Sequence, residues 1–149
     1  MNYIKSLRQH IGTKPIIAPG SAIIVLNENN ELLLQLRSDT NDWGLPGGGM
    51  EIGDSFEETA CKELYEETGL VAEELKLLGL ASGKELYYKF PHGDEIYNAT
   101  AIFKATAVTG SIKQNEESRD LKYFPLEKLP NLNYTTVKLL EKVGYLSMD

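Results

Sequence analysis

Three glutamates near the middle of the chain, Glu63, Glu66 and Glu67, have a spacing that could bind a metal ion. Residues three and four positions apart are neighbours on an α-helix, so a helix would gather these carboxylates on one side. They would repel one another, and Lys62 is the single base among residues 47–70. Carboxylate oxygens suit a hard divalent cation such as Mg²⁺, and Mn²⁺ would fit the same oxygens. The spacing therefore predicts a metal site, with a solvated acidic helix face as the alternative.

Three consecutive glycines, residues 47–49, precede the acidic stretch and would let the backbone approach a ligand closely. The loop lacks the Gly-Lys-Ser/Thr ending of a P-loop, and its glycine spacing does not fit a dinucleotide-binding fingerprint. The preceding "DTNDWG" does not fit a calcium-binding EF-hand loop, because Trp43 takes a ligand position. These exclusions leave an ordinary tight turn or a loop that serves the metal site.

A helix over residues 56–68 must position the three glutamates. Ser55 followed by Glu58 is the pattern of a capping box, and Gly69 stands where a left-handed residue ends a helix. The stripe expected to be buried recurs every four residues, at Phe56, Ala60 and Leu64. Signals at both ends thus set the limits of this helix.

The rest of the pattern predicts strands around this helix and a helix at each end of the chain. Apolar spacing indicates a short helix over residues 1–12 and another over 133–146. Two apolar runs joined by a polar turn at residues 27–30 indicate a hairpin. Further strands are expected around residues 75–81, 84–90, 96–108 and 121–124. We therefore expect an α/β architecture with helices on both faces of a sheet.

Length and composition limit the class of protein. With 149 residues and 42% hydrophobic content, the chain can form one globular domain with a core. Its net charge of −7 argues against binding a nucleic-acid duplex or an anionic membrane. Cys61 is the only cysteine, which argues against a disulfide framework and favours the cytoplasm. We find no secretory signal and no run long enough to span a bilayer, so a soluble protein is expected.

The acidic stretch resembles the Nudix hydrolase box. That box is Gly, five residues, Glu, seven residues, then Arg-Glu-hydrophobe-any-Glu-Glu-any-Gly-hydrophobe. Two specified positions carry conservative replacements, Asp54 for Glu and Lys62 for Arg. The other seven match, as Gly48, Glu63, Leu64, Glu66, Glu67, Gly69 and Leu70. The flanking stretches "ELLLQLR", "WGLPGG" and "LKYFPLEKLP" are also similar to the family, so the resemblance spans most of the chain.

The resemblance implies a Nudix-type α/β/α sandwich with a mixed sheet, formed by residues 1–149 as a single domain. It implies Mg²⁺-dependent hydrolysis of a pyrophosphate bond in a nucleoside diphosphate linked to another moiety. Such substrates include nucleotide polyphosphates, dinucleoside polyphosphates and nucleotide sugars. By position, Glu63 and Glu67 would be the principal metal ligands, Glu66 a further ligand that binds directly or through a water, and the Gly48 carbonyl a backbone ligand. The alternative is a Nudix-fold module that binds a nucleotide without cleaving it.

Residues outside the box complete the expected site. Family members often take their general base from the box glutamates or from outside the box, where a polar loop offers Glu116 and Glu117. Glu117 is the candidate, and a solvated loop acid is an equal alternative. Arg37 would hold a substrate phosphate, unless it is an exposed strand-end arginine. Tyr87 stands at a position that carries a tyrosine in some dinucleoside-polyphosphate-cleaving members. It, or its neighbour Tyr88, would stack on a base, and ordinary strand packing is the alternative. We expect a small-molecule nucleotide as the partner, bound by either a monomer or a homodimer.

Overall fold

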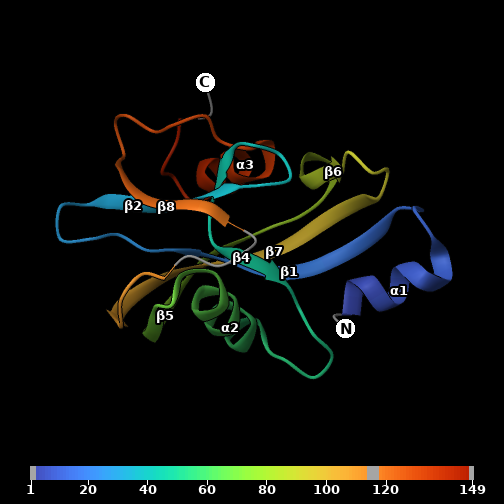
Figure 1. Cartoon of the computed structure of the whole chain (residues 1–149), viewed down its shortest axis with the longest axis horizontal. Coiled ribbons are helices and arrows are strands. Elements are labelled where there is room, and N and C mark those ends of the chain that lie inside the picture. Colours follow the sequence, from blue (N-terminus) through green and yellow to red (C-terminus); the bar gives the residue numbers. More distant parts are fainter. Residues whose placement is uncertain (1–2, 114–117, 148–149) are drawn as a thin grey trace.

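The computed structural model describes residues 3–113 and 118–147, and it forms two sheets and three α-helices (Figure 1). The predicted central helix is confirmed at its expected limits, Phe56–Thr68. The elements are α1 Tyr3–Ile11, β1 Ile16–Ile24, β2 Glu31–Arg37, β3 Trp43–Gly44, β4 Gly47–Gly49, α2 Phe56–Thr68, β5 Val71–Ala81, η1 Lys84–Leu86, β6 Tyr87–Lys89, β7 Glu95–Thr109, β8 Ser118–Pro125 and α3 Tyr134–Lys142.

The larger sheet is mixed, as the sequence predicted. Its strands lie in the order β4-β1-β7-β5, and β6 adds to β7. Strands β1 and β7 are parallel, whereas the other pairs are antiparallel. The smaller sheet has the order β3-β2-β8. The sequence pattern does not predict this division into two sheets.

The expected hairpin between β1 and β2 is wrong in one respect. The turn forms, because the Asn27 side chain accepts hydrogen bonds from the backbone of Asn29 and Glu31. The strands pair only briefly beyond it, through Leu26 and Leu32, and then separate into the two sheets. They diverge because β1 pairs with β7 over its whole length and with the short strand β4 on its other side, while β2 pairs with β8 over its whole length.

Two hydrophobic cores lie on opposite faces of the mixed sheet, so the α/β/α layers are confirmed. Successive side chains of a strand point to opposite faces. Accordingly Ile23 packs in the core with Ala60 and Leu64 of α2, whereas Ile24 packs in the other core with Leu140 of α3. Figure 1 shows α2 and α3 on either side of the sheet.

The caps of α2 form as predicted, but its buried face differs. Ser55 and Glu58 make both hydrogen bonds of the capping box, and Gly69 has a left-handed φ of 82°. Phe56 is 37% exposed and belongs to neither core, so its predicted burial is wrong. It is the first residue of the helix, whereas the buried residues of α2 begin at Thr59. That face instead includes polar residues, Thr59, Glu67 and Thr68.

The predicted strand over residues 84–90 is shorter in the structure. Lys84–Leu86 form a 3₁₀ turn, and only Tyr87–Lys89 form a strand, β6. The turn follows Gly83, whose φ of 93° suits glycine, and the Leu86 N–H donates to the Gly83 carbonyl.

Within the described ranges, each helix is too short or too polar to cross a membrane.

Candidate active site

The glycine strand β4 lies closer to β1 than any side chain would allow. A Cβ on Gly47 would overlap the Ser21 carbonyl oxygen and lie 2.9 Å from the Cα of Ala22. A Cβ on Gly20 of β1 would likewise overlap the Gly48 carbonyl oxygen. Both contacts are with backbone, which cannot swing away. Gly47 of β4 and Gly20 of β1 are therefore needed for the strand pairing itself.

The Glu63 carboxylate, the first of the cluster, packs against the backbone of Gly48. A Cβ on Gly48 would lie 2.5 Å from both the Cδ and the Oε1 atoms of Glu63. Helix α2 packs against β1 and β4, which presses this carboxylate onto the glycine strand. The absence of a side chain at Gly48 thus gives the Glu63 carboxylate its place.

Glu67 is a buried carboxylic acid, only 5% exposed. Its Oε1 accepts hydrogen bonds from the Gly47 N–H at 2.8 Å and from the Gln35 Nε2 at 3.1 Å. Burial raises the pKa of Glu67 to about 8, and the charge of Glu63 adds to this, whereas the Gly47 hydrogen bond, the Arg37 charge and Gln35 act in the opposite direction. Without a metal ion, the Glu67 carboxyl is thus mostly protonated near neutral pH, and a cation beside it would favour its ionised form.

An acidic cavity of about 460 Å³ contains all three glutamates of the cluster. Glu66 is exposed, and Lys62 on the same helix pairs with Asp54 at 2.6 Å. In the described part of the chain, no three Asp, Glu, His or Cys side chains are grouped so as to hold an ion by themselves. The cavity is lined by Ile4, Arg37, Gly47, Gly48, Gly49, Glu51, Asp54, Thr59, Lys62, Glu63, Glu66 and Glu67.

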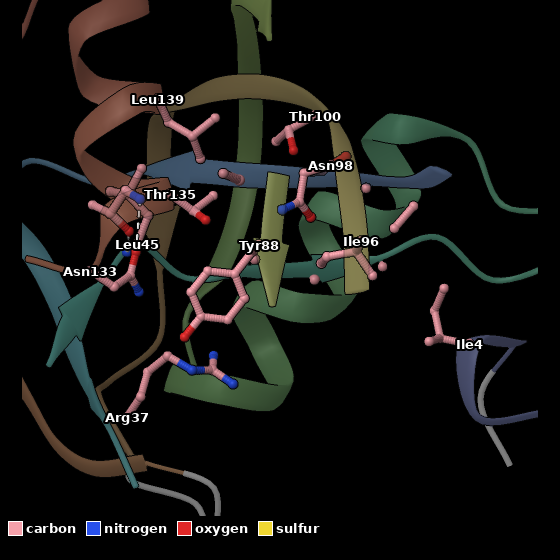
Figure 2. A pocket seen from close by; sticks show the side chains of 18 of the residues that line it. Ile4, Arg37, Leu45, Tyr88, Ile96, Asn98, Thr100, Asn133, Thr135 and Leu139 are labelled. Atoms are coloured by element: carbon pink, nitrogen blue, oxygen red, sulfur yellow. Dashed lines mark hydrogen bonds between the residues drawn. The ribbon is translucent and has the colours of Figure 1, made fainter. Parts of the chain in front are cut away.

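A second cavity, of about 300 Å³, lies beside the first and has a different character. Apolar residues such as Leu45, Ile96 and Leu139 form much of its wall, and Asn98 contributes an amide (Figure 2). Ile4, Arg37 and the three glycines line both cavities. The glycine strand thus forms a wall common to an acidic and a largely apolar cavity.

Arg37 and Tyr88 lie near each other at this second cavity. Figure 2 shows the Tyr88 hydroxyl directed toward the Arg37 guanidinium. The Arg37 Nε atom lies 3.1 Å from the Oδ1 atom of Asp39, and this ion pair orients the guanidinium. Because Arg37 lines both cavities, it can reach a ligand that spans them, and its planar group suits a phosphate.

Comparison with known proteins identifies the family. The family model described as NUDIX domain matches residues 17–143. The chain belongs to the Nudix family. It is 29% identical to an ADP-ribose pyrophosphatase of Methanocaldococcus jannaschii, over 78% of this chain and 68% of that protein. It is 34% identical to the putative ADP-ribose pyrophosphatase YjhB of Bacillus subtilis, over 73% of this chain and 50% of that protein.

Solved structures agree with this family. The MutT NUDIX hydrolase from Burkholderia pseudomallei is 25% identical and superposes with a TM-score of 0.72, over 86% of this chain and 98% of that chain. Several of the curated relatives are covered over half of their own length or less. The predicted Nudix family and fold are confirmed.

The structure of this Nudix protein brings together most of the predicted site residues, although their roles stay predictions. The Tyr87 hydroxyl donates to Glu95 at 2.5 Å, and Tyr87 lines neither cavity, whereas its neighbour Tyr88 lines one. Glu117 lies outside the described residues. Gly48, Glu63, Glu66, Glu67 and Arg37 all line the acidic cavity.

Sequence reasoning missed Gln35, the partner of Glu67. It is 2% exposed and lies on β2 among buried leucines. A lone amide within the apolar run "ELLLQLR" was a signal that could have found it, because a buried amide needs a hydrogen-bond partner. Its partner, 32 residues away, could not be named from the pattern.

The Lys62–Asp54 pair of the Nudix box predicts that Lys62→Arg is tolerated. The Lys62 side chain is 56% exposed, and arginine can reach the same carboxylate with a fork of donors. We expect a melting temperature equal to or slightly above that of the wild type, with turnover retained. Thermal unfolding and steady-state kinetics would check this. A marked loss of both would contradict the pairing of residue 62 with Asp54 as the function of this side chain.

Proposed function

We propose that this Nudix protein is a cytoplasmic, Mg²⁺-dependent pyrophosphohydrolase that cleaves a nucleoside diphosphate linked to another moiety. The observation that carries the proposal is the pair of cavities sharing Arg37 and the glycine strand. The acidic cavity suits a metal-bound diphosphate, and the apolar cavity suits the nucleoside attached to it. The names of two relatives, ADP-ribose pyrophosphatases, support the same class of substrate.

The donor atoms of the acidic cavity fit a hard cation. Mg²⁺ usually keeps several waters and takes one or two carboxylates together with substrate phosphates, so it does not need a complete cage of side chains. Glu63 and Glu67 would be its principal ligands, with Glu66 and the Gly48 carbonyl as further ones, and Mn²⁺ fits the same oxygens. When bound, the ion would neutralise phosphate charge and lower the pKa of an attacking water.

The protein's own residues would orient the substrate and hold the ligands. Gln35 and the Gly47 N–H hold the Glu67 carboxyl in place through hydrogen bonds to its Oε1. Arg37 would hold a phosphate between the cavities, and Asp39 steadies its guanidinium. Glu117 would be the general base that takes the proton of the attacking water.

A release assay over a panel of nucleotides, with Mg²⁺ and with EDTA, tests the proposal. The panel holds ATP, diadenosine polyphosphates, nucleotide sugars, ADP-ribose, coenzyme A and NADH. We expect Mg²⁺-dependent cleavage, with adenine-containing polyphosphates or nucleotide sugars preferred to coenzyme A and NADH. Binding of nucleotides without any metal-dependent turnover would contradict the enzyme and favour a nucleotide-binding module.

Mg²⁺ is expected to raise the melting temperature of the wild type much more than that of Glu63→Gln. An ion that binds only the folded carboxylates stabilises the fold and relieves their repulsion. Thermal unfolding with increasing Mg²⁺ measures the effect. Glu57→Gln is the matched control, because it removes the same charge from an exposed position of α2 that lines neither cavity. Equal shifts in the wild type and Glu63→Gln would refute the metal assignment.

Tyr88→Ala is expected to raise KM more than it lowers kcat. Loss of a stacking partner removes binding that substrate and transition state share, and such stacking is worth about 1–3 kcal/mol in nucleic-acid systems. Steady-state kinetics of Tyr88→Ala and Tyr87→Ala compare the residue at the cavity with the one chosen from the sequence. An effect confined to Tyr87→Ala would favour Tyr87 over Tyr88 as the stacking residue.

A further inference from the structure

Helix α1 reaches the site although it lies outside the part of the chain that matches the family. The match begins at residue 17, and α1 covers Tyr3–Ile11. Ile4 of this helix nevertheless lines both cavities. Its Cγ1 lies 3.6 Å from the position of a Cβ on Gly49, so it packs directly on the glycine strand. Figure 2 shows Ile4 projecting from α1 beside the cavity.

Polar contacts hold α1 at both of its ends. Near the start, the Tyr3 N–H donates to the Oε1 atom of Glu51 at 2.9 Å, and Glu51 lines the acidic cavity. Near the other end, the Arg8 Nη2 donates to the Glu95 carbonyl at 2.6 Å, and the Arg8 Nε lies 3.6 Å from Asp94. A helix of nine residues is not stable by itself in water, so these contacts decide where α1 lies.

The apolar face of α1 is incompletely covered. The helix is amphipathic, yet none of its residues is buried. Ile4, Leu7 and Ile11 are all partly exposed. A ligand that packs against Ile4 would remove more of this apolar surface from water, which favours binding. The Ile4 side chain has no polar group that could bind a charged phosphate, so we expect it to contact the less polar part of the substrate.

We propose that α1 forms a wall of the substrate site, in which Ile4 contacts the nucleoside or second moiety attached to the diphosphate, and Arg8 positions the helix. This inference rests on the proposed function for the identity of the ligand. It assigns to residues outside the matched part of the chain a share in choosing the substrate. Ile4 is the specificity residue, and Arg8 acts only through the placement of α1.

The test compares Ile4→Ala and Arg8→Ala with Gln9→Ala, an exposed position on the same helix. The nucleotide probe is ADP-ribose or ATP, whichever binds the wild type more tightly. Inorganic pyrophosphate, which has no nucleoside, is the second probe. Binding is measured by calorimetry with Ca²⁺, and KM and kcat with Mg²⁺. The affinity for Mn²⁺ alone is measured by electron paramagnetic resonance.

We expect Ile4→Ala to weaken nucleotide binding and raise KM by about 3- to 10-fold, with kcat within about twofold of the wild type. The affinities for pyrophosphate and Mn²⁺ should stay the same. Arg8→Ala should act in the same direction, with faster hydrogen exchange in α1. Gln9→Ala should match the wild type in every measurement.

Two results would overturn the inference. One is nucleotide binding by Ile4→Ala equal to that of Gln9→Ala, because Ile4 then does not touch the ligand. The other is an equal loss for pyrophosphate, because Ile4 would then act through the metal end of the site. Nucleotide binding that is sensitive to Ile4, without any hydrolysis, would support the wall and refute only the proposed activity. If the wild type binds neither nucleotide, both are refuted.

Discussion

Glu67→Gln is expected to leave a folded protein whose turnover falls by about a thousandfold. Glutamine keeps the shape of the side chain and an oxygen that can accept from the Gly47 N–H and from Gln35. It removes the charge that would hold the cation, and a loss of about 4 kcal/mol of transition-state stabilisation corresponds to about a thousandfold in rate. Steady-state kinetics and circular dichroism measure the two parts of this prediction.

The same variant has an expected signature in the absence of metal. The pKa of Glu67 is raised to about 8, from an ordinary value of 4.5, so the folded protein holds this proton more tightly than the unfolded chain. Its contribution to the free energy of unfolding should therefore fall as the pH rises from about 4.5 to about 8. In EDTA, Glu67→Gln should lose less stability than the wild type over this range.

Glu66→Gln is the internal comparison for Glu67→Gln, because Glu66 lines the same cavity but is exposed. We expect its effect on turnover to be smaller. Near-normal turnover of Glu67→Gln, with a normal melting temperature, would contradict the metal assignment of Glu67 and leave the fold unaffected.

Gly48→Ala and Gly47→Ala are expected to fail in different ways. The new Cβ of Gly48→Ala would meet the flexible end of Glu63, so the fold should survive while this carboxylate is displaced. A displacement of about 1 Å at a catalytic group can cost about a hundredfold in rate. The new Cβ of Gly47→Ala would instead meet the backbone of Ser21 and Ala22, so we expect a loss of about 2–4 kcal/mol in stability.

Gly79→Ala is the matched control for this pair of variants. Its new Cβ would meet only Val143, at an ordinary contact distance of 3.5 Å, and Gly79 has no positive φ. Urea unfolding and kinetics of the three variants separate the outcomes. Wild-type turnover in Gly48→Ala would show that turnover does not depend on the present position of the Glu63 carboxylate. Wild-type stability in Gly47→Ala would contradict the close approach of β4 to β1.

The sequence alone determined the helix that carries the glutamates and the family of the protein. Helix α2 begins and ends where Ser55, Glu58 and Gly69 predict, because caps are formed by residues within a few positions of one another. The spacing of Glu63, Glu66 and Glu67 likewise follows from the local geometry of a helix. These features depend on short-range contacts, which a sequence displays directly.

Only the tertiary structure decided how the three glutamates differ from one another. Glu66 is exposed, whereas Glu67 is buried with a raised pKa, although the two are adjacent in the chain. The difference arises because the packing of α2 on the sheet buries Glu67, and burial raises its pKa. Its hydrogen-bond partners Gln35 and Gly47, which act against this rise, lie 32 and 20 residues away in the chain. No local spacing predicts such pairs.

The walls of the cavities were also decided by long-range pairing. The turn before β2 was predictable, but the separation of β1 and β2 depends on partners as distant as β7 and β8. Tyr88 rather than Tyr87 lines a cavity, because the pairing of β6 with β7 sets which face each tyrosine occupies. Ile4 reaches Gly49 across 45 residues of chain, so α1 could be predicted as a helix but not as a wall of the site.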